Sequence, residues 1–113
     1  MARWFLVEFA NGPAWDAQRG RRQQAGWDEH APFVDALVAD GFVVLAGPVG
    51  EGEGDGAVLV VEADSDAAVR ARFADDPWLG TILELTSVRP WSIWARGPGG
   101  LPPAEGRSGD GGR

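Results

Sequence analysis

The sequence predicts an α+β fold with the element order β-α-β-β-α-β. Short apolar segments with the alternation typical of strands are interspersed with two segments of helical periodicity. Glycine, proline and aspartate residues separate these segments, as they do at turns and helix ends. The chain has 113 residues, of which 44% are hydrophobic and 24% charged. This length and composition suit a single domain with one packed core.

The first half of the predicted fold is a strand, a long loop and a helix. Residues 3–9 carry alternating side chains that are apolar on both faces, which indicates a strand. Residues 10–26 contain several glycines and are expected to form a loop that is partly helical. Residues 27–40 have helical periodicity, with Pro32 early in the helix, where a missing N–H group costs least, and Gly41 as the stop.

The central part of the chain is predicted to be a pair of strands joined by a loop. Residues 42–46 form the second strand, which Gly47 and Pro48 close. Residues 50–56 alternate glycine with acidic residues, a pattern that indicates a loop. Residues 57–63 are centred on four consecutive apolar side chains and form the third strand.

The last part predicts a short helix and a long strand. Residues 64–66 (Asp-Ser-Asp) are an N-cap signature for a helix over residues 67–74. Residues 75–78 end that helix and begin one further turn. A fourth strand is expected over residues 82–94, either bent at Pro90 or ending its pairing there. The complete order is that of a ferredoxin-like fold, an antiparallel sheet with two helices on one face.

The C-terminal segment is expected to lie outside the domain. Residues 97–113 hold seven glycines and three prolines but a single large apolar side chain. Such a segment cannot bury enough apolar surface to offset the entropy of ordering it, so it is predicted to be a disordered tail. The ferredoxin-like domain is therefore assigned to residues 1–96.

The predicted topology gathers three long connections at one end of the sheet. They are residues 10–26, 47–56 and 75–81, whereas the opposite end has only the tight turns near Gly41 and residues 64–65. Long loops on a rigid scaffold are where binding and catalytic residues concentrate. The functional site is therefore expected at this loop-rich end.

The composition excludes several classes of function. Arginine supplies all ten cationic side chains against seventeen acidic ones, and the net charge of -7 argues against nonspecific binding of nucleic acid. The absence of cysteine excludes disulfide scaffolds, thiolate catalysis and cysteine zinc sites, and one histidine cannot form a histidine-rich metal cluster. The apolar run near the N-terminus is too short for a signal sequence or a membrane span. A cytoplasmic protein without metal or cofactor is expected.

His30 is the strongest candidate for chemistry. It is the only histidine, and histidine is the residue type whose ordinary pKa lies near neutrality. Helical spacing places it near the middle of the apolar stripe formed by Phe33, Val34, Leu37 and Val38, so it should face inward at the loop-rich end. The alternative is a core histidine with one satisfied hydrogen bond.

Asp76 is the candidate partner of this histidine. Its position before Pro77 suits a helix N-cap, which by itself would explain the residue. Asp76 is also expected at the same end of the sheet as His30, where a carboxylate would orient the imidazole and stabilise its charged form. Asp75 is a competing carboxylate, but its position at a helix end favours solvent.

Arginine side chains could hold an anionic group of a substrate. Arg89 in the last strand is well placed for this, although a cross-strand pair with Glu8 or Glu84 is the simpler explanation. The arginines of the first long loop are expected to be solvated, with a grip on an anionic substrate as the alternative. These are Arg19, Arg21 and Arg22.

Apolar side chains on both faces of the sheet predict a homodimer. Two helices can cover only one face, and a large exposed apolar patch is unusual on a monomer. A twofold dimer with the sheets packed face to face would bury the other face. The side chains concerned include Trp4, Leu6, Val43, Val58, Val60 and Ile93.

Five short segments share their order and spacing with a known family. They are Glu29-His30-Ala31-Pro32-Phe33, Leu37…Asp40-Gly41, Leu45-Ala46-Gly47-Pro48, Ala74-Asp75-Asp76-Pro77-Trp78 and Val88-Arg89-Pro90-Trp91. Together they resemble the YCII-related (YciI-like) family over about residues 3–94. The resemblance implies a ferredoxin-like fold, a dimer of the dimeric α+β barrel type, and an active site at His30 and Asp76. Relatives include a chloromuconolactone dehalogenase, and muconolactone isomerase shares the superfamily.

The hypothesis from the sequence is a cofactor-independent enzyme of the lyase or isomerase type, acting on a small lactone-like or aromatic substrate. His30 would take a proton and Asp76 would orient the imidazole. The expected substrate-binding residues are Arg89, Trp27, Trp78, Trp91, Gly47 and Pro48. The alternative is a noncatalytic dimer that binds a small ligand or a partner protein.

Overall fold

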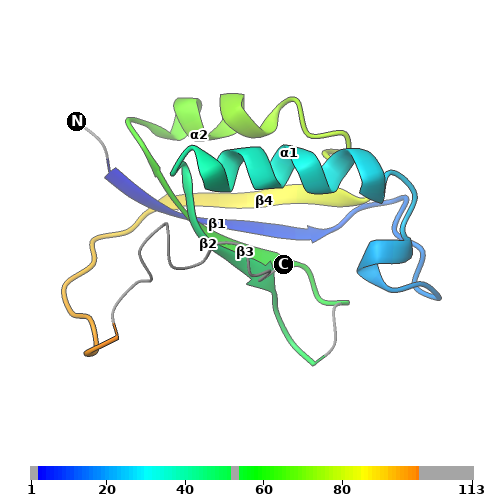
Figure 1. Cartoon of the computed structure of the whole chain (residues 1–113), viewed down its shortest axis with the longest axis horizontal. Helices are drawn as coiled ribbons and strands as arrows, with labels where there is room; N and C mark the ends of the chain where they lie inside the picture. The colour runs from blue at the N-terminus through cyan, green and yellow to red at the C-terminus, as the bar shows by residue number, and fades with distance from the viewer. Residues whose placement is uncertain (1–2, 52–53, 100–113) are drawn as a thin grey trace.

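A computed structural model describes residues 3–51 and 54–99 and has the predicted order of elements. The elements are β1 (Arg3–Asn11), the 3-10 helix η1 (Arg21–Gln23), α1 (Trp27–Ala39), β2 (Val43–Pro48), β3 (Ala57–Ala63), α2 (Asp66–Phe73) and β4 (Leu83–Pro90). The strands form one four-stranded antiparallel sheet in the order β2-β3-β1-β4. Both helices lie on the same face of this sheet (Figure 1). The predicted ferredoxin-like fold is therefore confirmed.

The core lies between the helices and one face of the sheet. Phe5 and Val7 of β1 are fully buried and stand opposite Val61 and Leu59 of β3, which point to the same side. The period of two in β1 therefore separates a core face from an open face. The core consists of Phe5, Val7, Phe9, Leu37, Phe42, Val43, Leu59, Val61, Ala63, Val69, Phe73, Trp78, Ile82, Leu83 and Val88.

Each helix begins at a residue that suits its start. The helix α2 is capped by Ser65, whose side-chain oxygen accepts a hydrogen bond from the Ala68 amide at 3.1 Å, as its sequence predicts. The helix α1 begins after Gly26, which has φ of 82° and so a left-handed conformation that suits glycine. Pro32 lies inside α1 and leaves the Asp28 carbonyl without its intrahelical partner, but both residues are exposed, where water can replace the missing amide.

The ends of two strands can be compared with the prediction. The strand β4 ends at Pro90, which is one of the two expected alternatives, because an edge strand that reaches a proline has no amide to continue the ladder. One further hydrogen bond joins the Trp91 amide to the Trp4 carbonyl at 2.9 Å. The strand β2 continues through Gly47 and Pro48, which had been expected to close it, because a proline is tolerated on this edge of the sheet.

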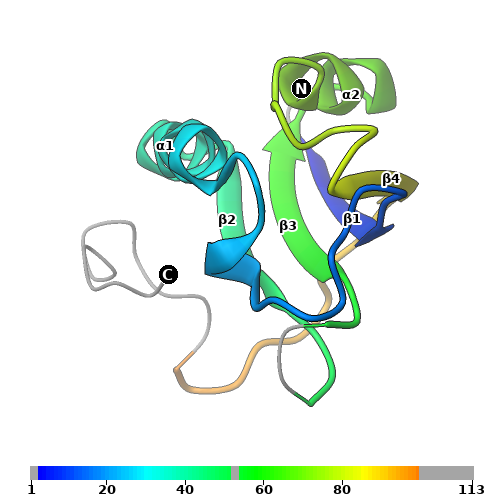
Figure 2. The same cartoon turned by 90° about the vertical axis from the view of Figure 1, so that its right-hand side faces the viewer.

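Three connections meet at one end of the sheet, as the topology predicts. Figure 2 shows the β1–α1, β2–β3 and α2–β4 connections on the side that faces the viewer. The first and third are joined by hydrogen bonds from the Gly12 amide to the Ile82 carbonyl at 2.7 Å and from the Ala14 amide to the Thr81 carbonyl at 2.9 Å. A Cβ atom on Gly12 would lie 2.3 Å from the Thr81 carbonyl oxygen, so only glycine permits this approach.

The open face of the sheet is apolar along its centre. Val60 is buried there, opposite Leu6, while Leu45 remains 39% exposed. Val43 had been expected on this face but faces the core, because it stands opposite Val61. A groove of about 200 Å³ lies on the open face. It is lined by Trp4, Leu45, Val60, Trp91, Ile93, Ala95, Arg96 and Gly97.

The C-terminal tail was predicted over residues 97–113. From position 100 onward this segment lies outside the described residues. Among the described residues, none of the helices has the length and apolar character needed to cross a membrane.

Candidate functional site

The fold brings His30 and Asp76 together at the loop-rich end. His30 lies in the first turn of α1, and Asp76 lies in the turn that follows α2. The two residues are 46 positions apart in the sequence. The Nδ1 atom of His30 is 2.9 Å from the Oδ1 atom of Asp76. Both residues are buried, with 8% and 7% of their surface exposed. The predicted inward orientation of His30 is therefore confirmed.

Asp76 contacts the histidine and also caps the turn that follows it. Its Oδ1 atom accepts a second hydrogen bond from the Trp78 amide at 2.9 Å, and its carbonyl accepts one from the Leu79 amide at 3.0 Å. The capping role and the contact with His30 are thus both present. The neighbouring Asp75 is exposed to solvent, as its position predicts.

The hydrogen bonds of the pair determine which ring nitrogen of His30 is available. An ionised carboxylate only accepts hydrogen bonds, so with Asp76 ionised Oδ1 accepts from both the Trp78 amide and the ring, and Nδ1 carries the hydrogen. Within the described part of the chain, no group hydrogen-bonds to Nε2. Nε2 is also not one of the fully enclosed polar atoms, so it keeps contact with solvent. This nitrogen is a base with a free lone pair.

Two tryptophans surround the imidazole. The Trp78 indole stacks on the His30 ring with centroids 3.9 Å apart and planes 9° apart. The Trp27 ring lies 5.8 Å from the His30 ring at an angle of 50°. Trp78 is 1% exposed and Trp27 is half-buried. Both tryptophans therefore lie at the site, but only Trp27 has surface left for a ligand.

The structure separates Arg89 and Trp91 from this pair. Arg89 stands opposite Leu6 on the open face, at the end of β4 away from the loops, and its Nη2 atom is 3.1 Å from Oε1 of Glu8. The cross-strand ion pair considered as the simpler explanation is thus present. Trp91 borders the groove on the open face. Both were expected near the substrate, but the register of β4 against β1 shifts between Glu8 and Phe9, and Arg89 therefore lies on the side opposite the helices.

The second strand contributes Gly47 and Pro48 at the end of the sheet where the long loops meet. Gly47 stands opposite Val58 on the open face, and Pro48 stands opposite Ala57 on the helix-covered face. Pro48 is therefore on the same side of the sheet as His30. Gly47 occupies a position on the opposite, open face.

The arginines of the first long loop differ in their environment. Arg19 is exposed and lies 3.4 Å from Asp16, as expected for a solvated residue. Arg21 is buried instead, because its guanidinium donates to the Gly56 carbonyl at 3.3 Å and lies over the Trp15 ring. The expectation of solvation was wrong for Arg21, since a tertiary contact with the β2–β3 connection was not visible in the spacing.

Gln24 holds this loop together, a role that the sequence did not predict. It is 3% exposed, its Oε1 atom accepts from the Asp16 amide at 2.9 Å, and its Nε2 atom donates to the carbonyls of Asp16 at 2.8 Å and Arg19 at 3.0 Å. A lone glutamine among glycines and arginines carries no signal for such a role. Its bonds connect both ends of the segment 16–24.

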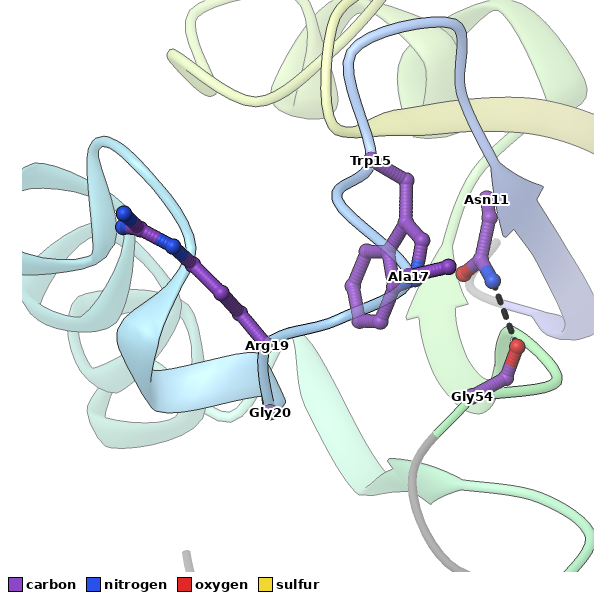
Figure 3. Close-up of a pocket in the computed structure, with 6 residues that line it drawn as sticks. All are labelled: Asn11, Trp15, Ala17, Arg19, Gly20 and Gly54. Carbon is purple, nitrogen blue, oxygen red and sulfur yellow. Dashed lines mark hydrogen bonds between the residues drawn. The ribbon is translucent and has the colours of Figure 1, made fainter.

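A surface pocket of about 380 Å³ lies beside this loop (Figure 3). Its lining residues are Asn11, Trp15, Ala17, Arg19, Gly20 and Gly54. The Arg19 side chain points away from Asn11 and Trp15 in Figure 3. The carboxamide oxygen of Asn11 is fully enclosed, so a ligand in the pocket has no access to it. Neither this pocket nor the groove on the open face includes His30.

Comparison with known proteins identifies the fold. No family model and no curated protein matches the chain. A similar solved structure is that of 5-chloro-2-hydroxyhydroquinone dehydrochlorinase from Burkholderia phenoliruptrix AC1100, in complex with 2,5-dihydroxybenzoquinone. The match has a TM-score of 0.56 and 23% sequence identity and covers 83% of this chain and 95% of that one. At this identity the likeness supports the ferredoxin-like architecture.

Among the described residues, no group of three or more histidine, cysteine, aspartate or glutamate side chains could hold a metal ion.

Proposed function

We propose that this protein is an enzyme of the lyase or isomerase type that removes a proton from a small cyclic substrate, with His30 as the general base. The observation that carries the proposal is the hydrogen bond of 2.9 Å between Nδ1 of His30 and Asp76, which leaves Nε2 with a free lone pair in contact with solvent. A base of this kind is oriented by its carboxylate partner and needs a substrate within hydrogen-bond reach of Nε2.

The proposed reaction begins when Nε2 takes a proton from an acidic C–H or O–H group. The electron pair of the broken bond stays on the substrate as an enolate or phenolate, and the imidazole becomes an imidazolium. The Asp76 carboxylate stabilises this positive charge through the Nδ1 hydrogen bond. In a lyase that acts on a phenolic ring, the ring carbon bearing the leaving group first takes up a proton, as in the keto tautomer. The electron pair of the O–H or C–H bond broken by Nε2 then expels the leaving group as an anion from this tetrahedral carbon. In an isomerase Nε2 instead returns the proton to another atom of the substrate. Neither sequence of steps requires a cofactor.

The substrate class follows from the environment of the histidine. Trp27 is half-buried beside His30 and offers an aromatic surface for a planar ring. The similar solved structure is that of a dehydrochlorinase bound to 2,5-dihydroxybenzoquinone, which is a planar hydroxylated ring. We therefore propose a hydroxylated aromatic, quinone-like or lactone ring as substrate, with Pro48 at the border of the site. Arg89 and Trp91 are not part of the proposed site.

A direct test uses 5-chloro-2-hydroxyhydroquinone as the probe, with release of chloride as the readout. His30→Gln should lower turnover by about 10²- to 10⁴-fold, the usual contribution of a general base. Asp76→Asn should also lower turnover, because the ring keeps an acceptor but loses the carboxylate charge that stabilises the imidazolium. The matched control is Asp75→Asn, which makes the same chemical change at the adjacent exposed position and should leave turnover unchanged.

Two outcomes would contradict the proposal. Unchanged turnover in His30→Gln would show that another group is the base. No turnover by the unmodified protein, together with no effect of 2,5-dihydroxybenzoquinone on the NMR signals of the His30 ring, would instead favour the noncatalytic alternative for this ligand class.

We also propose that the protein is a homodimer formed through the open face of the sheet. The support is the exposure of apolar side chains at this face, with Leu45 at 39% and Trp91 at 44%. A stable interface buries about 1,600 Å² in total. Sedimentation should therefore give twice the chain mass of 12.0 kDa, and Leu45→Glu should shift it toward the monomer. A natively folded protein of single-chain mass at micromolar concentration would refute the dimer.

A further inference from the structure

Trp78 is completely enclosed at the site, although a ring that binds substrate needs free surface. It is 1% exposed, and the His30 ring covers its face at 3.9 Å. We infer that Trp78 is a positioning residue that holds the imidazole of His30 in its reactive orientation, and not part of a substrate-binding wall. This inference rests on the proposed function of His30 as a base.

Hydrogen bonds hold Trp78 through its backbone and through its side chain. The backbone amide of Trp78 donates to Oδ1 of Asp76 at 2.9 Å, and the indole Nε1 atom donates to the Ala25 carbonyl at 2.8 Å. Ala25 directly precedes Gly26, the N-cap of the helix that carries His30. A Cβ atom on Gly26 would lie 3.1 Å from Nε1 of Trp78, so the indole lies closer to the start of α1 than most side chains would allow. Trp78 is thus connected to both chain segments that supply the pair, through its backbone amide to Asp76 and through its indole to Ala25.

The stacking geometry restricts the motion of the imidazole. Because the two ring planes are 9° apart with centroids at 3.9 Å, rotation about the Cβ–Cγ bond of His30 drives one edge of its ring into the indole. The Nδ1 hydrogen bond to Asp76 and the indole face therefore constrain the ring in two different directions. Together they keep Nε2 pointing to one place, which is what a general base requires.

The indole face also acts on the charge of the ring. A cation above the face of a tryptophan is attracted by the ring's electron density, most strongly where water is excluded. When Nε2 accepts a proton, the imidazolium therefore lies between the Asp76 carboxylate and the Trp78 indole, and both stabilise it. Trp27 has a different role, because its ring is tilted by 50° and half-buried, which leaves it available to a ligand.

The test uses the full chain labelled with ¹⁵N-histidine, in which the single histidine gives one set of ring signals. In the unmodified protein Nδ1 should carry the hydrogen, and this hydrogen should exchange slowly with water. Trp78→Leu should speed its exchange about two- to twelvefold, the factor that corresponds to the loss of one stacked aromatic pair. Trp78→Phe keeps an aromatic face but loses the bond to Ala25, so its exchange rate should lie between those of the unmodified protein and Trp78→Leu.

Phe73→Leu is the matched control, because Phe73 is an equally buried ring that packs edge-on against Phe9 and Phe42. It should lower the stability of the domain and leave the Nδ1 exchange unchanged. Equal exchange in Trp78→Leu and Phe73→Leu would overturn the inference, since Trp78 would then serve packing alone. A hydrogen on Nε2 in the unmodified protein would instead refute His30 as the base, so the two failures are distinguishable.

Discussion

Replacement of Asp76 by alanine should destabilise the domain far more than the same change at Asp75. Asp76→Ala removes the acceptor of two hydrogen bonds, those from Nδ1 of His30 and from the Trp78 amide. The two residues that donate these bonds are buried, with His30 8% and Trp78 1% exposed, so water does not easily replace the lost carboxylate. Asp75 is exposed and should tolerate the change.

The magnitude follows from the two bonds. Loss of a capping side chain costs about 1 kcal/mol, and a buried donor left without a partner costs about 1–3 kcal/mol. We therefore expect Asp76→Ala to lower the free energy of unfolding by about 2–4 kcal/mol, which for a domain of this size lowers Tm on the order of 10–20 °C. Asp76→Asn keeps an oxygen that can accept both bonds and should cost about 1 kcal/mol. Asp75→Ala should remain within about 0.5 kcal/mol of the unmodified protein.

The assay is thermal and urea-induced unfolding, followed by far-UV circular dichroism and by tryptophan fluorescence. Coincident transitions in the two signals would justify a two-state treatment. If Asp76→Ala and Asp75→Ala unfolded within about 0.5 kcal/mol of each other, the buried hydrogen bonds would not hold this end of the fold together. The proposed orientation of His30 by Asp76 would then lose its structural basis.

Three further changes test other parts of the fold. Ser65→Ala removes the cap of α2 and should lower the free energy of unfolding by about 1 kcal/mol in urea titrations. Gly12→Ala places a Cβ atom 2.3 Å from the Thr81 carbonyl oxygen, so calorimetry should show a lower Tm, and an unchanged Tm would mean that the two loops are not held together. Arg89→Ala breaks an exposed pair with Glu8 and should cost less than about 1 kcal/mol, with an effect that shrinks further in high salt.

Local pattern was sufficient to predict the elements of the fold. The alternation of β1, the helical periodicity of α1 and the Ser65 cap of α2 are properties of neighbouring residues, and all three are present in the structure. The order of the elements then restricted the topology to the ferredoxin-like sheet, because connections of this kind follow few rules. For the last strand the sequence left two alternatives open, a bend at Pro90 or an end of pairing there. In the structure β4 ends at Pro90, at the edge of the sheet.

The position of the candidate site also followed from the sequence, through topology. The helical periodicity of α1 predicted that His30 faces inward. The position of Asp76 just after α2 predicted that it lies at the same end of the sheet. The structure adds the contact of 2.9 Å between them. The face of Arg89 could not be read in the same way, since a bulge between Glu8 and Phe9 shifts the register of β1 against β4.

By itself, the sequence determined the elements, their order and the end of the sheet where the histidine and the aspartate lie. Only the tertiary structure decided which atoms meet there. It stacked the Trp78 indole on His30, left Nε2 without a partner among the described residues, and buried Arg21 against the β2–β3 connection. The physical reason is range: periodicity and capping act over a few neighbouring residues, whereas a ring stack between residues 48 positions apart depends on how the helices and loops pack in three dimensions.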